Sequence, residues 1–380
     1  MTRRFDRKLI AVVLALLVLG LVMVQSASGP VASDRMHDSW FYVKRQIFAM
    51  IPGLVGCIAL AMVPYEAIRK YVWAAYGAVI LALLLVFVPG ISHGANGATR
   101  WIGIGSIHLQ PSEFAKIVVV LCMAHFLDQH AGRLNDTKRV LLPALLIPVP
   151  LLVLVLAEPD FGTTVIIGGM AFLTLYVAGL SARWIYGIAA AGGLALIPAL
   201  TFAAYRMERV KSFLDPWADA AGSGYQVIQS LIAFHSGGLM GRGLGESQAK
   251  HLFLPEPWTD FVASVLAEEL GLVGIFALLC LYVILVWRGL NIARNAPDLF
   301  GTLTASSITA ALGLQAFFNL GVVTGIVPPK GLVLPFMSYG ASAIIAHLYC
   351  VGILLNISAS SGRTKPEPAI YRPAIAVEEG

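Results

Sequence analysis

Long apolar stretches recur along the whole chain of 380 residues and leave little room for any other architecture. A helix that crosses a bilayer needs about 20 mostly apolar residues. Ten stretches are candidates, with short polar breaks around 158–160 and 181–183. Their centres lie near Leu17, Gly56, Ala82, Leu121, Pro150, Gly169, Gly193, Phe276, Leu314 and Tyr349. The pattern predicts an all-α polytopic membrane protein with about ten transmembrane helices.

The composition excludes several other classes of protein. Only 12% of the residues are charged, about half of what the surface of a soluble domain requires. A soluble enzyme, a disordered chain and a disulfide scaffold are therefore excluded. The net charge of +5 comes from basic clusters between apolar runs, which is typical of membrane orientation signals and not of nucleic-acid binding.

The basic residues also predict the orientation of the chain. Four of them precede the first apolar run, and Ser26-Ala27-Ser28 follows it, as in a signal peptide. The run from Leu9 to Val24 is long for a signal peptide and nine more runs follow. We therefore expect a retained first helix, with both termini in the cytoplasm.

This orientation places most of the polar loop material outside the cell. We expect one membrane domain over residues 1–357, with a large extracytoplasmic loop at 205–260 between spans seven and eight. The loops 91–112 and 326–340 lie on the same face. The tail 358–380 is polar and contains three prolines, which predicts cytoplasmic disorder.

The motifs of soluble enzymes are missing from the sequence. It contains no GxxxxGK[ST], HExxH or paired CxxC motif. The string GRGLG at 241–245 lacks the βαβ context of a nucleotide loop, so we interpret it as a loop turn. ATP-driven transport by this chain alone is unsupported.

Charged residues next to the apolar runs are the main candidates for function, because each is costly to insert into a membrane. Glu113 and Lys116 lie on one helix face at i,i+3 spacing. They form either a structural ion pair or part of a polar cavity. Asp160 either caps the next helix or contributes to chemistry. Lys330, in the apolar and proline-rich outer loop that we expect to fold back on the helices, binds a phosphate or snorkels to the interface.

The segment 251–274 contains the strongest candidate. Thr259 and Asp260 lead into an apolar helical run, so Thr259 is a possible N-cap with Asp260 in the first turn. Alternatively, Asp260 is a carboxylate at the membrane–water boundary that accepts a proton from a hydroxyl group. Glu268 and Glu269 lie two turns deeper, where Glu269 pairs with a neighbouring helix or approaches the cytoplasmic side. The spacing alone does not decide between these alternatives.

Four strings in this chain resemble the SEDS family of peptidoglycan polymerases. They are NGATRWIGIGSIHLQPSEFAK (96–116), EPDFGTT (158–164), GRGLGESQAKHLFLPEPWTDFVASVLAEELGLVG (241–274) and PPKGLVLPFMSYGAS (328–342). They occur in the family's order, and the resemblance covers essentially all ten spans. The run GRGLGESQAKHLFLPE favours the FtsW branch of the family over the RodA branch, and the sequence does not decide between septal and lateral-wall synthesis.

The resemblance implies an inner-membrane glycosyltransferase that polymerises lipid II and acts with a class B penicillin-binding transpeptidase and other division proteins. It implies that Asp260 is catalytic and that Glu113 and Lys116 line the cavity. Two positions depart from the family pattern. Trp258 stands where histidine is common, and Ala341 replaces the second glycine of SYGGS.

The chemistry of the reaction suggests further roles. We hypothesise that Asp260 deprotonates the 4-hydroxyl group of a sugar while Arg100, Arg242, Lys330 or a divalent cation (Mg or Mn) neutralises the leaving diphosphate. The matching strings add further candidates for the cavity, which are Asp160, Glu256 and Ser338. Two other functions remain open: a flippase for lipid-linked sugars and a scaffold for division proteins.

Overall fold

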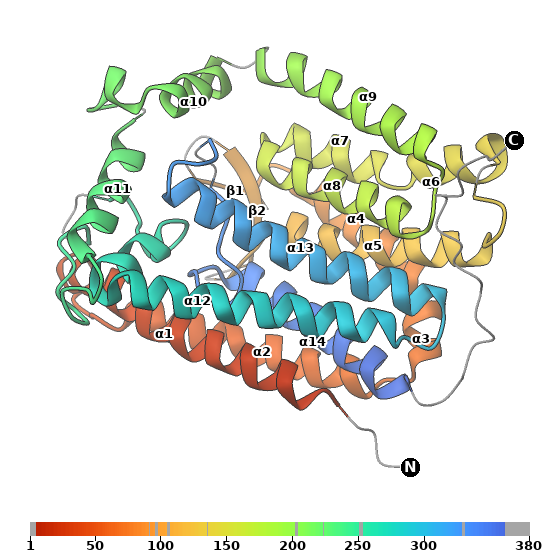
Figure 1. Ribbon diagram of the computed structural model, residues 1–380, viewed down its shortest axis with the longest axis horizontal. Coiled ribbons are helices and arrows are strands. Elements are labelled where there is room, and N and C mark those ends of the chain that lie inside the picture. Colours follow the sequence, from red (N-terminus) through yellow and green to blue (C-terminus); the bar gives the residue numbers. More distant parts are fainter. Residues whose placement is uncertain are drawn as a thin grey trace, which may run out of the picture.

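The structure is a computed structural model, and it is almost entirely helical (Figure 1). It describes residues 5–90, 92–95, 98–104, 107–134, 136–201, 204–222, 224–250, 254–328 and 331–361. The first half contains the helices α1 (Arg7–Met36), α2 (Phe41–Met62), α3 (Tyr65–Lys70), α4 (Val72–Leu85), α5 (Pro111–Gln129), α6 (Leu142–Leu146), α7 (Val149–Ala157) and α8 (Phe161–Val177). The second half contains α9 (Ala182–Thr201), α10 (Ala204–Leu214), α11 (Tyr225–Gly237), α12 (Val262–Arg294), α13 (Leu299–Val323) and α14 (Ala341–Ser360).

The helical membrane architecture predicted from the sequence is confirmed. Every one of the ten predicted span centres falls inside a helix. Among the described residues, six helical stretches are long and apolar enough to cross a membrane, namely α1, α2, the stretch Thr137–Ala157, α12, α13 and α14. The helices α4 and α8 are apolar but shorter. The count of ten spans therefore stays a prediction.

The centre of the bundle is formed by long helices that lie side by side (Figure 1). Helix α12 packs against α1 and α13, and α14 packs against α2 and α5. Capping side chains start several helices, because an aspartate accepts an N–H that would otherwise be unpaired. Asp6 caps α1, Asp160 caps α8 and Asp298 caps α13. The π turn Thr137–Leu141 links α5 to α6.

Two of the predicted outer loops contain regular structure that the sequence pattern did not reveal. Within 91–112, the strands β1 (Ser92–Ala95), β2 (Ala98–Ile104) and β3 (Ile107–Leu109) form an antiparallel sheet in the order β1-β2-β3. Within 205–260 lie α10, the 3-10 turn Pro216–Asp219 and α11. These elements were not predicted, since short elements carry too little periodicity to be recognised.

The last outer loop and the tail follow the predictions more closely. Leu332, Leu334, Phe336 and Met337 are buried, so the part of this loop over 331–340 folds back on the helices as expected. Helix α14 continues to Ser360, slightly beyond the predicted start of the tail. The remaining tail, 362–380, lies outside the described residues.

Candidate active site

Asp260 lies in the loop before α12 and is not part of the helix. Helix α12 begins at Val262, and its N-cap residue Phe261 makes no side-chain capping bond. The alternative in which Thr259 is the N-cap is therefore wrong. The Thr259 hydroxyl lies 2.9 Å from Asp260 Oδ1 and 2.8 Å from the carbonyl oxygen of Glu256. Asp260 does not serve to start a helix.

The backbone of Asp260 is held by α13. The Asn319 side-chain amide donates to the Asp260 carbonyl oxygen at 2.8 Å and to the Leu332 carbonyl oxygen at 2.6 Å. A single buried side chain thus joins the segment before α12 to the outer loop 331–340. A Cβ atom built on Gly331 would lie 3.4 Å from Asp260 Oδ2. The carboxylate therefore faces this loop at a position where the chain has no side chain.

Trp258, one of the two departures from the family pattern, fixes the same segment from the other side. Its carbonyl oxygen accepts the Tyr339 N–H at 2.8 Å. Its buried ring packs against Tyr42, with 4.7 Å between the ring centroids. Because the Trp258 backbone is paired with another loop, it is not available to extend α12 toward its N-terminus.

The surroundings of Asp260 make it a stronger base. Burial raises the pKa of the Asp260 carboxyl above its usual range, and the negative charge of Glu256 adds to this effect. The hydrogen bond from Thr259 and the positive charge of Arg209 on α10 lower the pKa by less. The residue is half-buried, so the carboxyl combines a raised proton affinity with partial exposure.

Glu113 and Lys116 form the buried ion pair that their spacing predicts. Lys116 Nζ lies 2.8 Å from Glu113 Oε2 in the first two turns of α5. Lys116 also donates to Gln315 Oε1 on α13 at 3.3 Å, and the Gln315 amide donates to the Val333 carbonyl oxygen at 2.9 Å. The pair is therefore connected through α13 to the same outer loop that Asp260 faces.

A second group of polar residues connects β2 and α5 with the break between α7 and α8. Arg100 Nε donates to the Glu158 carbonyl oxygen at 3.2 Å, and its terminal nitrogen donates to the Pro159 carbonyl oxygen at 2.7 Å. Asp160 accepts the Thr163 N–H at 3.1 Å, so the predicted helix cap is confirmed. The Gln110 amide donates to Asp160 Oδ2 at 3.4 Å.

Glu158 is an unusual member of this group. Its side chain is fully buried, and neither carboxyl oxygen has a hydrogen-bond partner among the described residues. Burial, together with the charge of Asp160, raises the pKa of Glu158 to about 8, against the opposing effect of the charge of Arg100. Glu158 is therefore largely protonated at neutral pH, which removes the cost of a buried unpaired charge.

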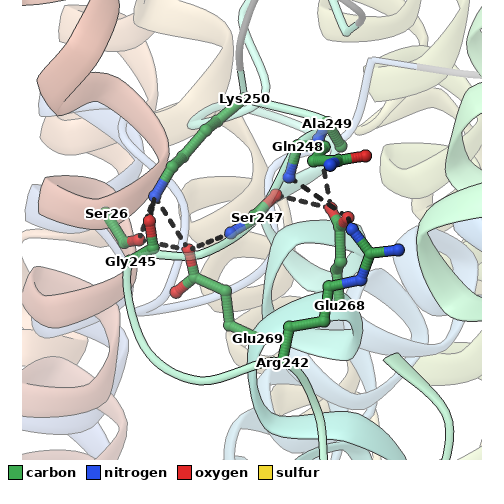
Figure 2. A network of polar contacts seen from close by, with 9 residues as sticks. All are labelled: Ser26, Arg242, Gly245, Ser247, Gln248, Ala249, Lys250, Glu268 and Glu269. Carbon is green, nitrogen blue, oxygen red and sulfur yellow. Dashed lines mark hydrogen bonds and ion pairs between the residues drawn. The ribbon is translucent and has the colours of Figure 1, made fainter. Parts of the chain in front are cut away.

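Glu268 lies at the other end of the first segment of α12 and binds the loop that precedes Asp260 (Figure 2). Its carboxylate accepts the Ser247 hydroxyl at 2.6 Å and the N–H groups of Gln248 and Ala249 at 3.1 Å each. Arg242 NH1 lies 3.5 Å from Glu268 Oε1. Arg242 thus binds near the far end of the first segment of α12, about 9 Å along the helix from Val262, and is not brought beside Asp260.

Glu269 pairs with the neighbouring helix α1 and with the loop 242–250 (Figure 2), which is the first of the two predicted alternatives. The Ser26 hydroxyl of α1 donates to Glu269 Oε1 at 2.5 Å. Lys250 Nζ lies 3.2 Å from the same oxygen, and both charged side chains are almost completely buried. We name Glu268, Glu269, Lys250, Ser247 and Ser26 the latch cluster, because it fastens the loop 242–250 to α12.

The remaining predicted residues occupy different surroundings. Ser338 is buried, and its hydroxyl oxygen accepts the Leu334 N–H at 2.8 Å, which closes a turn of the outer loop. Glu256 is exposed in a left-handed conformation with φ of 46°. Lys330 lies outside the described residues. The sequence indicated neither Asn319 nor Gln315, which appear in it only as polar residues within an apolar run.

The described residues do not form a metal site of their own. No group of three His, Cys, Asp or Glu side chains converges in the described part of the chain. Magnesium commonly binds through one or two carboxylates and the phosphates of a substrate. Asp260 and its neighbour Glu256 fit only that arrangement, in which the substrate supplies most of the ligands.

Comparisons with known proteins agree with this architecture. Residues 7–363 match the sequence model of the FtsW/RodA/SpoVE family, described as cell cycle proteins. A protein of Geobacter metallireducens named probable peptidoglycan glycosyltransferase FtsW is 41% identical over 93% of this chain and 95% of its own length. Stage V sporulation protein E of Bacillus subtilis is 38% identical over 93% of this chain and 96% of its own length.

Solved structures show the same fold. A chain of a peptidoglycan synthase complex, studied for the coordination of polymerization and crosslinking, superposes with a TM-score of 0.78 at 32% identity. That match covers 94% of this chain and 99% of the other. The rod shape determining protein RodA of Thermus thermophilus superposes with a TM-score of 0.70 at 29% identity, covering 94% and 97%. The chain belongs to the FtsW/RodA/SpoVE family of bacterial membrane proteins, which is the SEDS family that its sequence strings resemble.

Proposed function

We propose that this protein is a peptidoglycan glycosyltransferase that joins lipid II disaccharides into β-1,4 glycan strands, with Asp260 as general base. The names of its FtsW relatives support the activity. The single observation that carries the role of Asp260 is its environment. It is a half-buried carboxylate with a raised pKa, held by its backbone and placed outside the helix.

The reaction is a single displacement. The 4-hydroxyl oxygen of the acceptor sugar attacks C1 of the donor sugar, and the bond from C1 to the diphosphate oxygen breaks. The diphosphate leaves with the electron pair, and the hydroxyl proton passes to an Asp260 carboxylate oxygen. An α-linked donor gives a β-linked product because the attack comes from the opposite face.

The leaving diphosphate needs positive charge in the same region. Arg100 lies near the break between α7 and α8, and Lys116 is buried at the start of α5. A divalent cation held mainly by the diphosphate is compatible with Asp260 and Glu256 and supplies further neutralisation. Arg242 is a weaker candidate than the sequence suggests, because it binds Glu268.

We infer a plasma-membrane location with both termini in the cytoplasm and a role at the division septum. The resemblance of the loop 241–256 to the FtsW branch, together with the FtsW relatives, supports this role. A crosslinking transpeptidase is the proposed partner, because the peptidoglycan synthase complex combines polymerization with crosslinking.

The decisive experiment is polymerisation by the purified chain with lipid II already on the accessible leaflet of a vesicle, with and without transpeptidase and chelator. The wild-type protein should make glycan, and the rate should fall as pH decreases through a pKa above the usual aspartate range. A flippase or a scaffold would make no glycan under these conditions. Full activity of a folded Asp260→Asn variant would exclude the proposed base.

A further inference from the structure

Helix α12 is broken at Gly271, and an outer-loop turn fills the break. Gly271 has non-helical angles (φ 66°, ψ −163°), so backbone groups on both sides of it lose their helical partners. Leu272 N–H donates to the Gly238 carbonyl oxygen at 2.9 Å, and Gly243 N–H donates to the Glu269 carbonyl oxygen at 3.0 Å. The turn Gly238–Gly245, which we name the apolar turn, therefore completes the hydrogen bonding of the broken helix.

The apolar turn is rigidly fixed against α12. A Cβ atom on Gly241 would overlap the Glu269 carbonyl group, and one on Gly271 would overlap the backbone of Gly241. Gly243 and Gly245 have φ of 108° and 87°, angles that side chains other than glycine rarely adopt. The latch cluster follows at once in the chain and fastens the next residues (Figure 2). The turn cannot rearrange freely to cover its own side chains.

Three large apolar side chains of this fixed turn nevertheless point away from the protein. Leu239 is 69% exposed and Met240 81% exposed, and Leu244 is exposed as well. They continue an exposed apolar surface on α12 that begins at Leu272 and Val273, immediately after the break. A contiguous exposed apolar surface of this kind marks contact with a membrane or with another protein.

The neighbouring helix α1 indicates which contact this is. Leu14, Val18 and Val22 form an exposed apolar row at i,i+4 spacing, and the next position of the row is Ser26. Ser26 is bonded to Glu269, just before the break of α12. On both helices, the exposed apolar surface therefore ends at the same level along the bundle, where Ser26 contacts Glu269.

The length of the apolar surface of α12 agrees with this boundary. From Leu272 to Leu290 the helix exposes large apolar side chains and is about 27 Å long at 1.5 Å per residue. The hydrocarbon core of a bilayer is about 30 Å thick. In contrast, every residue from Val262 to Glu269 is buried. The break thus lies at one end of the exposed apolar surface of α12.

We propose that the apolar turn is a membrane anchor, with Leu239, Met240 and Leu244 inserted among the lipid chains of the leaflet on the Asp260 side. Arg242, in the same turn and partly exposed, lies at the height of the lipid phosphates. Given the proposed function, the anchor also sets the height of the active site. The segment Val262–Leu270 holds Asp260 about 13 Å above the hydrocarbon edge, where the head group of a lipid-linked sugar lies.

Site-directed spin labelling tests the anchor without any assay of activity. Met240→Cys and Leu244→Cys are labelled with a nitroxide in the full-length protein, reconstituted in nanodiscs of phosphatidylethanolamine and phosphatidylglycerol. Gln248→Cys, at an exposed residue of the same loop, is the matched control. Phe276→Cys is the lipid-facing reference, and the unsubstituted protein gives the labelling background. Collision rates with oxygen and with a water-soluble nickel chelate are compared.

At positions 240 and 244 we expect a several-fold higher ratio of oxygen to nickel collisions than at 248, approaching the ratio at 276. A nickel accessibility at 240 and 244 equal to that at 248 overturns the proposal. Shielding that appears only after another membrane protein is added also overturns it, because the surface would then be a protein interface. The result is independent of whether the protein polymerises lipid II.

Discussion

The two ends of the first segment of α12 carry acidic residues in opposite circumstances. Glu268 and Glu269 are buried, and seven polar groups from the loop 242–250 and α1 bind their oxygens. Asp260, two turns away, is half-buried and held by its backbone, with Thr259 as its side-chain donor. Neighbouring carboxylates in one sequence motif thus differ in the number of donors they bind, which fits a structural role for Glu268 and Glu269 and the reactive role that we propose for Asp260.

The largest expected effect is the loss of polymerisation in Asp260→Asn, which distinguishes Asp260 from the acidic residues at the other end of the first segment of α12. Asp260→Asn should reduce the polymerisation rate about 10²–10⁴-fold, the range by which a general base contributes to catalysis. Its melting temperature in detergent should stay near that of the wild type, because the substitution preserves the shape and the Asn319 bond to the backbone. An Asn variant that melts much earlier than the wild type would show that Asp260 is structural, like Glu268.

The Lys250–Glu269 pair should show the reverse profile. Lys250→Met leaves a fully buried Glu269 without its cation, and breaking a buried pair costs about 3–5 kcal/mol. The expected result is a clear loss of thermal stability, measured by fluorescence-detected unfolding. Lys138→Met, at an exposed lysine, is the control and should change little.

A double variant sharpens this prediction. Lys250→Met combined with Glu269→Gln removes both charges and should be more stable than Lys250→Met alone. Additive losses of stability in the double variant would mean that the two side chains are not coupled.

The sequence predicted most of the helical architecture, but few of the contacts that give its charged residues different roles. The apolar runs located all ten helical centres, because a bilayer imposes a length and a composition that can be counted. The break at Gly271 could not be predicted from the sequence, since the apolar pattern continues through it without interruption. The partners of Arg242 could not be predicted either, because they depend on how a loop distant in the sequence folds back on α12.

The helix-cap alternatives show the same limit at the scale of single residues. Asp160 and Asp260 both precede an apolar helix, and both fit a cap pattern. Asp160 caps α8, whereas Asp260 is kept out of α12 because Tyr339 pairs with the backbone of Trp258. Local spacing predicts a cap only where no distant segment competes for the same backbone.

Glu158 is a third kind of carboxyl, because neither of its oxygens has a hydrogen-bond partner among the described residues. Its effect on the stability of the protein depends on pH. The folded protein holds its proton up to about pH 8, whereas the unfolded chain releases it near the ordinary value of 4.5. Stability should therefore fall as pH rises between these values, by on the order of a few kcal/mol. Glu158→Gln should remove this decline, so that the variant melts later than the wild type at pH 8 and similarly at pH 5. Melting curves that keep the same pH dependence in the variant would contradict a raised pKa at Glu158.

The smallest effect is expected at Arg242, because its side chain is partly exposed and only loosely bound to Glu268. Its guanidinium is 3.5 Å from Glu268, and its side chain is 37% exposed, so solvent screens the pair. Arg242→Gln should therefore cost less than about 1 kcal/mol of stability, because Glu268 keeps its bonds to Ser247, Gln248 and Ala249. Polymerisation should also change little, since Arg242 binds Glu268 near the far end of the first segment of α12 and not Asp260. A large loss of polymerisation with unchanged melting would instead place Arg242 on the leaving diphosphate and would require the loop 242–250 to move toward Asp260 during the reaction.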